Sequence, residues 1–527
     1  MWNKLLPTHG CEQAPGLCRL RDYKRNNRSG EVGSAVKRSG SEVLLVFPGR
    51  YRAPDPQVPL QLLHVASTLR QAGYRPRIVD LRLQDYHSLD IGEPLFVGLT
   101  CMSGPQIRYA LEFARKMRAE HPRVPLVWGG IHPTLLPEQA AAHECVDVVV
   151  RGESESIVAA LADRLAAGEP LGGSKDGSLD AVKGLTYADD GAITSTPDAG
   201  LIDLDTIPVE LPYDLLHLDK YATLQAGRVH MQTSRGCPHR CGFCYNTDFN
   251  GRKWRGKSPG RVVDEMEALL RRFPHVRIID PVDDNFFVDR KRAEAICNEI
   301  LSRGIKVAWR ANCRFDYLAK YDRDFVRLLE RAGCMELDFG GESGSVAMQD
   351  FVCKDVSAEE MLTSVAHLHE WAPSIDPFVS WLSGLPGETY HDMTQTFDLM
   401  DAMGRANPRT QHYGIFLYTP FSSPLLESLP PEFRPPQSLD EWGEIEVFHF
   451  EPPWHTRQYV EKLRTISAVT RYAFYPESRI DEHSPAFRAA YRLMNRAARY
   501  RWEHRYFGFP VELRLANEVA KRMRGFL

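Results

Sequence analysis

The stretch Cys237-Pro-His-Arg-Cys241-Gly-Phe-Cys244, entered through Met231-Gln-Thr-Ser-Arg-Gly, places three thiols within eight residues. Three thiols this close can bind one small object, and soft sulfur ligands favour iron–sulfur clusters and zinc over hard cations. A closed zinc or iron site needs a fourth ligand. No fourth cysteine follows at a ferredoxin-like spacing, but His239 lies between the first two thiols. A zinc site that includes His239 is therefore the simpler alternative.

The spacing Cys-x3-Cys-x2-Cys, with Phe243 just before the third thiol, resembles the signature of the radical S-adenosylmethionine (SAM) enzymes. The resemblance implies that Cys237, Cys241 and Cys244 hold three irons of a 4Fe-4S cluster. It also implies that the remaining iron binds SAM, with Phe243 beside it. An iron without a protein ligand is an open coordination site, and open sites are where metal centres perform chemistry.

Length and composition restrict the possible classes of protein. A chain of 527 residues is too long for one ordinary core, so two to four domains are expected. The net charge of −4 gives no support for nucleic-acid binding, which usually needs a basic surface. The sequence has no run of apolar residues long enough for a membrane span.

The ends of the chain and its cysteines indicate the compartment. Residues 1–40 are basic and lack an apolar signal segment, so we predict a mobile tail and no secretory signal. The eleven cysteines are an odd number, and three of them are assigned to a cluster that oxygen would damage. A reducing, cytoplasmic location is therefore predicted.

Residues 41–170 alternate between apolar strand-like runs and helical patterns. This alternation predicts a parallel, doubly wound, Rossmann-like sheet. Ligands of such sheets lie at the carboxyl ends of the strands. The absence of Gly-x-Gly-x-x-Gly after the first strand disfavours a dinucleotide. The predicted strands are Val43–Phe47, Arg77–Asp80, Leu95–Thr100, Val124–Trp128 and Val146–Val150.

Three segments of this domain resemble the cobalamin-binding domain that precedes many radical SAM cores. They are Thr100-Cys-Met-Ser-Gly, Trp128-Gly-Gly-Ile-His-Pro-Thr and Val150-Arg-Gly-Glu. The resemblance implies that cobalamin binds at these strand ends. The candidate cobalamin contacts are Thr100, Ser103, Gly129, Gly130 and His132.

The lower ligand of cobalt is a separate question. Asp85-Tyr86-His87 resembles the first half of the Asp-x-His-x-x-Gly motif, but Asp90 occupies the glycine position. The radical SAM branch that the chain resembles commonly lacks this histidine, so the resemblance implies that cobalt can be held without a protein ligand. Packing or loop positions are the favoured roles for His64 and His132.

Residues 171–227 are predicted to be a linker that contains a hairpin at residues 185–195, and residues 228–425 repeat strand and helix six times. This pattern predicts an open, partial (β/α)6 barrel with its chemistry at the carboxyl ends of the strands. The predicted strands are His230–Ser234, Val276–Asp280, Lys306–Arg310, Met335–Phe339, Phe378–Leu382 and Tyr413–Tyr418.

Several groups at these strand ends are candidate SAM contacts. Gly340-Gly341-Glu342 resembles the family motif that binds the amino group of SAM, and its alternative is an ordinary turn. Ser380 could contact the ribose or simply pack. Arg310 could pair with the SAM carboxylate or form a structural ion pair.

The predictions for three further segments are less specific. Asp283-Asp284-Asn285 is polar enough to line the site, and its role is open. Leu385-Pro-Gly-Glu-Thr389 is predicted to be a turn and helix cap. Residues 426–527 are predicted to form a helical C-terminal region whose aromatic residues either build a core or close over the substrate.

The preferred function is therefore a cobalamin-dependent radical SAM methyltransferase, in which a 5′-deoxyadenosyl radical activates a substrate carbon that receives a methyl group from cobalamin. The expected cofactors are a 4Fe-4S cluster, SAM and cobalamin, and the expected partners are a small-molecule substrate and an electron donor such as a flavodoxin or ferredoxin. Two alternatives stay open. One is a cyclase, rearrangement or oxidation enzyme on the same scaffold, and the other is a non-catalytic cobalamin or metal-binding sensor.

Overall fold

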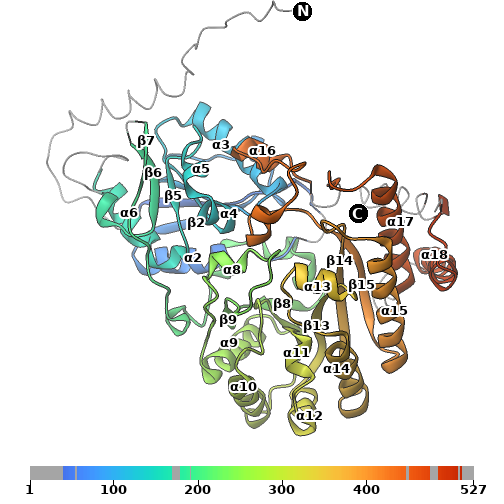
Figure 1. Ribbon diagram of the computed structural model, residues 1–527. Coiled ribbons are helices and arrows are strands. Elements are labelled where there is room, and N and C mark those ends of the chain that lie inside the picture. The colour runs from blue at the N-terminus through green and yellow to red at the C-terminus, as the bar shows by residue number, and fades with distance from the viewer. Residues whose placement is uncertain are drawn as a thin grey trace, which may run out of the picture.

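The computed structural model describes residues 40–53, 56–168, 179–189, 191–446, 450–474 and 485–508, together with residues 511, 512 and 515. The predicted tail at residues 1–40 lies almost entirely outside this range. Two mainly parallel sheets stand side by side, each with helices packed on it (Figure 1). The prediction of an α/β fold with two such sheets is confirmed.

The first sheet has seven strands in the order β2-β1-β3-β4-β5-β6-β7. Side chains of β1 alternate between its two faces, with Leu45 packed among α2 and α6, and Leu44 packed among α3. This is the doubly wound arrangement that was predicted. Its elements are β1 Glu42–Phe47, α2 Leu60–Gln71, β2 Arg75–Asp80, β3 Val97–Thr100, α3 Pro105–Glu120, β4 Leu126–Gly129, α4 Ile131–Leu135, α5 Pro137–Ala141, β5 Val148–Val150, α6 Val158–Ala166, β6 Leu185–Asp189 and β7 Ala192–Ser195.

The hairpin of the predicted linker is part of this first sheet. Strand β6 pairs antiparallel with β5, and β7 pairs with β6, so the sheet continues past residue 170. Leu185 and Tyr187 are buried on this extension. The hairpin therefore forms the edge of the first domain rather than a free connection.

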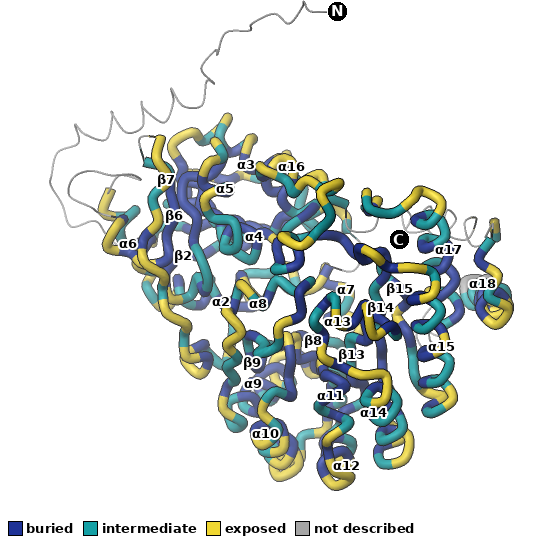
Figure 2. The backbone as a smooth tube through the Cα atoms, viewed as in Figure 1, coloured by how far each residue is buried: buried dark blue, intermediate teal, exposed yellow. Residues whose placement is uncertain are grey.

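The second sheet has six parallel strands in the order β15-β14-β13-β12-β11-β8 and does not close on itself. The buried strands run through the middle of this half-barrel, and the exposed turns lie at its outer rim (Figure 2). The partial barrel is as predicted. Its elements are β8 Arg228–Met231, α9 Pro259–Arg272, β11 Ile278–Pro281, α10 Arg290–Ser302, β12 Ala308–Cys313, α12 Arg323–Arg331, β13 Cys334–Glu342, α14 Ala358–Trp371, β14 Asp376–Ser383, α15 Tyr390–Ala406 and β15 Gln411–Leu417. Short helices add α7 Ala222–Gln225, α8 Asn246–Phe249, α11 Phe315–Leu318 and α13 Val346–Phe351.

The first predicted strand of the half-barrel is split. Strand β8 ends at Met231, and a second strand, β9 (Ser234–Arg235), pairs antiparallel with β10 (Arg255–Gly256) in a separate ribbon. The buried carboxylate of Asp283 explains the break, because it accepts hydrogen bonds from the Thr233 amide at 2.6 Å and the Ser234 hydroxyl at 2.7 Å. These bonds direct the chain away from β11 and into the cysteine loop.

Helix capping follows the sequence at most positions. Ser357 and Glu360 form the predicted capping box of α14, and Thr389 caps α15 with Asp392. Helix α9 begins at Pro259 as predicted, but the Ser258 side chain makes no capping hydrogen bond. The segment at residues 385–389 is thus the turn and cap that was expected.

The C-terminal region has two parts. Helix α16 (Leu439–Gly443) packs on α3, so a segment that follows β15 reaches back to the first domain (Figure 1). Helix α17 (Arg457–Phe474) packs on β15, and α18 (Pro485–Glu503) packs on α17. Core packing is thus the role of the aromatic Trp502 and Phe507. In the described part of the chain, no helix is both long enough and apolar enough to cross a membrane.

Candidate functional site: two adjoining cavities

A first cavity of about 510 Å³ lies at the carboxyl ends of the half-barrel strands. The sulfur-bearing residues Cys237, Cys241 and Cys244 all contribute to its wall. The loop between them is fixed to the barrel, because the Gly242 amide donates to the Val352 carbonyl at 2.8 Å. The predicted residues that line this cavity are Cys237, Cys241, Phe243, Cys244, Arg310, Gly340, Glu342 and Ser380.

The arrangement of these thiols fits a cluster better than a single ion. Among the described residues, no three His, Cys, Asp or Glu side chains are placed to hold one metal ion. His239 does not line the first cavity, and its Nε2 atom lies 2.6 Å from the Tyr317 hydroxyl. The zinc alternative therefore finds no fourth ligand beside the thiols, whereas three thiols on the wall of one cavity suit a larger iron–sulfur group.

Polar groups also face the cysteine sulfurs. The Arg314 guanidinium lies 3.7 Å from Cys241 Sγ, and the Asn285 amide nitrogen lies 3.9 Å from Cys237 Sγ. Burial raises the pKa of Cys237 and raises that of Cys244 to about 12. These two thiols are therefore protonated before a metal binds, and metal binding releases protons.

The segment Gly340-Gly341-Glu342 is the end of β13 and not a separate turn. Glu342 has a φ of +58° at a register shift between β13 and β14. A Cβ atom on Gly340 would collide with the Glu342 carboxylate and lie 2.6 Å from Lys354 Nζ. The glycine therefore leaves room for a carboxylate that turns back over the strand.

Lys354 pairs with that carboxylate in the first cavity. Its Nζ atom lies 2.8 Å from Glu342 Oε1, and both side chains are buried. Burial alone would lower the pKa of Lys354, but the Glu342 carboxylate raises it. The cavity thus holds an internal pair of opposite charges, which suits a zwitterionic amino acid group.

The remaining SAM candidates, Ser380 and Arg310, also line the first cavity and make contacts within the half-barrel. Ser380 lines the first cavity, and its hydroxyl donates to the Phe339 carbonyl at 3.3 Å. Arg310 also lines it, but its guanidinium contacts Asp280 at 2.9 Å and Glu336 at 3.0 Å. The structural ion pair is therefore the alternative that the structure favours for Arg310.

The three polar residues after β11 differ in position. Asp283 is buried and supports the chain before the cysteine loop, as described above. Asp284 accepts from the Gly236 amide at 2.9 Å and from the Tyr245 hydroxyl at 3.2 Å. Asn285 faces Cys237. Only Asp284 and Asn285 line the first cavity.

A second cavity of about 340 Å³ begins at the carboxyl ends of the first sheet. Its inner part is apolar and runs between the sheet and α2, whereas its mouth faces the half-barrel. An apolar slot with a polar mouth fits a large cofactor with an aromatic end, and this edge of the sheet is where such folds bind ligands. The inner part is lined by Leu45, Leu62, Val65, Phe96, Gly98 and Val127. The half-barrel contributes Gln232, Arg235, Tyr245, Phe249, Asn250, Val282 and Asp284.

Three of the five predicted cobalamin contacts line this second cavity, namely Thr100, Gly129 and Gly130. Ser103 and His132 do not line it. Their side chains bond to each other, with Ser103 Oγ 2.9 Å from His132 Nδ1. The His132 ring packs against Trp442 of α16, with the ring centroids 5.3 Å apart. Helix α16 thus forms a strap over His132, and nothing in the sequence indicated this.

The histidines considered as cobalt ligands are also separated. His87 lies in a short 3-10 turn and lines neither cavity. His64 was expected only to pack, yet it lines the second cavity and lies 3.1 Å from the Arg235 guanidinium. Its surroundings are charged rather than apolar.

The two cavities share a wall. Val282 and Asp284, which directly follow β11, line both of them. This fold and this pair of sites define an enzyme class in which a cobalamin-type domain is joined to a radical SAM-type half-barrel.

Comparison with known proteins agrees with that class. Residues 52–162 match the B12 binding domain, and residues 231–400 match the Radical SAM superfamily. An uncharacterized methyltransferase of Pyrococcus horikoshii is 30% identical over 368 residues, which cover 67% of this chain and 76% of that protein. The chain therefore belongs to the family of B12-binding radical SAM enzymes.

Two more distant proteins are also similar. The anaerobic magnesium-protoporphyrin IX monomethyl ester cyclase of Rubrivivax gelatinosus is 26% identical over 405 residues, covering 75% of this chain and 68% of that protein. The structure of the radical SAM methyltransferase TsrM from Kitasatospora setae, with cobalamin and a 4Fe-4S cluster bound, has a TM-score of 0.59. It is 21% identical and covers 74% of each chain, so this likeness concerns the fold.

The sequence did not reveal several residues of the site. Lys354 and Arg314 belong to no motif, and only the folded chain brings them to Glu342 and Cys241. Glu153 and Arg235 stand inside segments quoted above, yet no role was assigned to them. Their contacts join residues of two different domains, so no local sequence pattern predicts them.

Proposed function

We propose that this chain is a cobalamin-dependent radical SAM methyltransferase that acts on a small molecule. The shared wall of the two cavities carries the proposal, because a substrate held at Val282 and Asp284 lies within reach of both sites. When bound, the 4Fe-4S cluster with SAM supplies a hydrogen-abstracting radical, and cobalamin supplies a methyl group.

The residues of the first cavity would hold the iron–sulfur cluster and SAM. Cys237, Cys241 and Cys244 would ligate the cluster, and the Arg314 guanidinium would donate toward the Cys241 sulfur. Glu342 would accept from the ammonium group of SAM. Gly340 keeps the backbone open at that point, whereas Gly341 is absent from the cavity wall and packs against Trp381. Phe243 and Ser380 would complete the wall.

The second cavity would hold cobalamin. Thr100, Gly129 and Gly130 would contact it at the sheet edge, and the apolar slot beside α2 would take its aromatic end. Tyr245 would close the cavity from the half-barrel side. These walls exclude water from the space where the reacting groups meet.

An external donor would supply electrons to the cluster. We propose a flavodoxin or ferredoxin for this role, in a reducing cytoplasm that suits oxygen-sensitive thiols. The residues of the site, and not the shared fold, determine which substrate is bound and which reaction occurs.

A ring-forming or oxidative reaction is the second candidate. The similarity to the Rubrivivax gelatinosus cyclase favours it, since that match extends over 75% of this chain. Such a reaction needs the radical but does not transfer a methyl group.

The test uses the holoenzyme, reconstituted anaerobically, with SAM and a chemical reductant. We expect two products, 5′-deoxyadenosine from the cluster site and S-adenosylhomocysteine from methyl transfer to bound cobalamin. Cys241→Ala should abolish 5′-deoxyadenosine and limit S-adenosylhomocysteine to at most one equivalent per bound cobalamin, because the methyl group then has no substrate radical to receive it. Cys297→Ala, at a buried cysteine distant in the chain, should leave both products unchanged. Formation of 5′-deoxyadenosine without any S-adenosylhomocysteine would reject the methyltransferase and favour the second candidate.

A further inference from the structure

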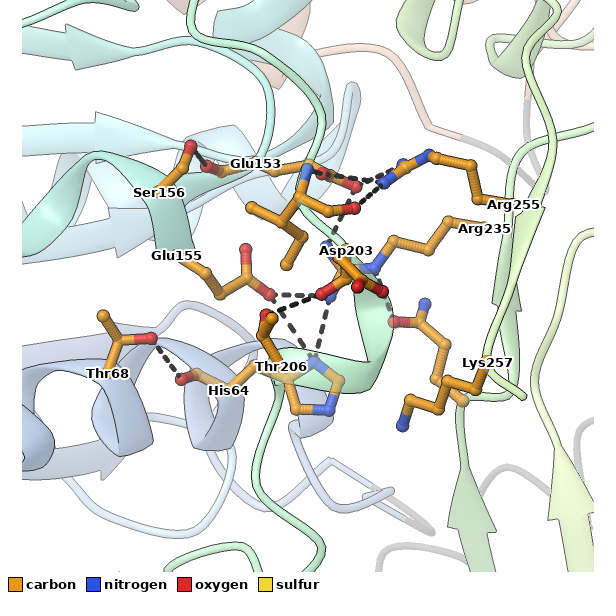
Figure 3. Close-up of polar contacts among 12 residues, drawn as sticks. His64, Thr68, Glu153, Glu155, Ser156, Asp203, Thr206, Arg235, Arg255 and Lys257 are labelled. Carbon is orange, nitrogen blue, oxygen red and sulfur yellow. Dashed lines mark hydrogen bonds and ion pairs between the residues drawn. The ribbon is translucent and has the colours of Figure 1, made fainter. Parts of the chain in front are cut away.

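A buried group of charged side chains joins the two domains beside the second cavity (Figure 3). We call Arg235, Arg255, Glu153, Glu155 and His64 the interdomain network. The two arginines come from the half-barrel side, whereas the glutamates and the histidine come from the first domain. In Figure 3 the two sets point toward each other.

Arg235 is the centre of the interdomain network. Its guanidinium contacts Glu153 Oε1 at 3.1 Å, Glu155 Oε1 at 2.6 Å and His64 Nδ1 at 3.1 Å. Its Nε atom donates to Gln232 Oε1 at 2.7 Å. Three of these four contacts cross to the first domain.

Arg255 holds the same glutamate from the neighbouring strand. Its Nη2 atom lies 2.6 Å from Glu153 Oε1, and its Nη1 atom donates to the Ile202 carbonyl at 2.6 Å. The Ile202 amide donates to Glu153 Oε2 at 2.8 Å. Glu153 is therefore bound on both oxygens.

The position of these arginines connects the interdomain network to the cysteine loop. Arg235 and Arg255 are cross-strand partners in the β9–β10 ribbon. The three cysteines lie on the loop between the two strands, and Cys237 comes two residues after Arg235. The ribbon is thus the base of the loop, and its two arginines attach that base to the first domain.

Burial makes this attachment strong. The side chains of Glu153 and Arg235 are only 4% and 13% exposed. Burial alone would raise the pKa of Glu155, but Arg235 and His64 hold it well below its usual range. Breaking a buried ion pair leaves a charge without a partner, which costs far more than losing a surface pair.

We propose that Arg235 is a positioning residue that fixes the cysteine loop, and with it the iron–sulfur cluster, relative to the cobalamin cavity. The inference rests on the proposed function in one respect only, namely the identity of the cofactors that occupy the two cavities. Neither domain holds this geometry alone, because each supplies one sign of charge.

Two variants and one control test the inference. Glu153→Gln removes the shared carboxylate charge, and Arg235→Lys keeps the charge but cannot make four contacts at once. Glu299→Gln is the matched control, since Glu299 pairs with Arg303 on the exposed side of the half-barrel. Hydrogen exchange is measured on the apoprotein, and pulsed electron paramagnetic resonance gives the distance distribution between the reduced cluster and cob(II)alamin in the holoenzyme.

We expect amides of residues 232–246 to exchange on the order of a hundredfold faster in both variants. Exchange in α12, which lies away from the network, should not change. The distance distribution should broaden at least twofold while iron and cobalt contents stay at the level of the control. Unchanged loop exchange and an unchanged distribution would overturn the proposal. Faster exchange throughout the chain, including α12, would also overturn it, because the variants would then lower general stability. Loss of cobalamin alone, with unchanged exchange in the loop, would overturn it as well, because Arg235 would then act by binding the cofactor directly. Because exchange is read without cofactors or turnover, failure of the methyltransferase proposal would not alter this result.

Discussion

At the residue scale, the buried pair of Glu342 and Lys354 determines how the first cavity can receive an amino acid group. SAM carries an ammonium and a carboxylate on the same carbon atom. If the ammonium binds Glu342, the displaced Lys354 is the nearest cation for the carboxylate. The zwitterion would thus be inserted into an existing ion pair.

Lys354→Met should therefore weaken the binding of SAM by about tenfold to a hundredfold, the value of one charged hydrogen bond. Decarboxylated SAM should bind both proteins equally, because it lacks the group that Lys354 would contact. Calorimetric titration of the reconstituted enzyme measures both affinities. Lys320→Met, at an exposed lysine, is the control. Equal losses for the two ligands would contradict this assignment.

Glu388 predicts a pH dependence of stability. Burial raises its pKa from 4.5 to about 8. Between these two values the folded chain keeps a proton that the unfolded chain has released, so the free energy of unfolding decreases as the pH rises. The decrease begins near the unfolded pKa and is complete above the folded one.

Glu388→Gln cannot titrate, so its apparent melting temperature should fall less than that of the natural chain between about pH 5 and pH 8.5. Scanning calorimetry at several pH values measures the difference. Glu432→Gln, at an exposed glutamate, should leave the pH dependence unchanged. If the melting temperatures of Glu388→Gln and the natural chain changed in parallel with pH, the Glu388 carboxyl would be ionised in the folded protein.

At the element scale, the β9–β10 ribbon depends on one glycine. Gly236 has a φ of +87°, and a Cβ atom there would collide with the Lys253 carbonyl oxygen. Gly236→Ala should displace the start of the cysteine loop and lower the iron bound per chain severalfold after reconstitution. Gly251→Ala is the matched control, because Gly251 also has a positive φ but no atom within 4 Å of its Cβ position. Full iron content in Gly236→Ala would disprove the dependence.

The sequence predicted regular elements well and their irregularities poorly. Strands β1, β13 and β14 follow from apolar runs, and the capping box of α14 from Ser357 and Glu360. The break between β8 and β9 was missed, because it depends on the buried Asp283 about fifty residues later in the chain. The pairing of the hairpin with β5 was missed for a similar reason, since strand pairing across a loop leaves no local pattern.

The candidate site shows the same difference between features that a local motif predicts and features that depend on distant segments. The cysteine triad and Glu342 belong to motifs of contiguous residues, and they line the first cavity as expected. Lys354 and the interdomain network arise from contacts between distant segments. The packing of His132 against Trp442 of α16, some three hundred residues later, is likewise a contact that no local motif indicates.

At the scale of the whole molecule, two ties hold the domains together. One is the interdomain network, and the other is the strap through α16. Trp442 of the strap is fully buried in the core of the first domain. Arg115 and Asp440 add an ion pair at its edge.

Trp442→Ala should destabilise the first domain by about 3–5 kcal/mol, as large-to-small core changes do. Hydrogen exchange of α3 should accelerate, whereas exchange of α12 should not. Trp371→Ala, at a half-buried tryptophan on α14, serves as the control and should leave α3 unchanged. Unaltered exchange of α3 in Trp442→Ala would mean that the strap does not support the first domain.

The composite lining of the second cavity has a consequence for engineering. Because Tyr245, Phe249 and Asn250 of the half-barrel complete a cavity that begins in the first sheet, that sheet is not a self-contained cassette. A chimera that imports residues 40–227 from a relative would carry only part of the cofactor's surroundings. The sensible unit of recombination therefore includes the cysteine loop and its ribbon, so that both halves of the cavity are inherited together.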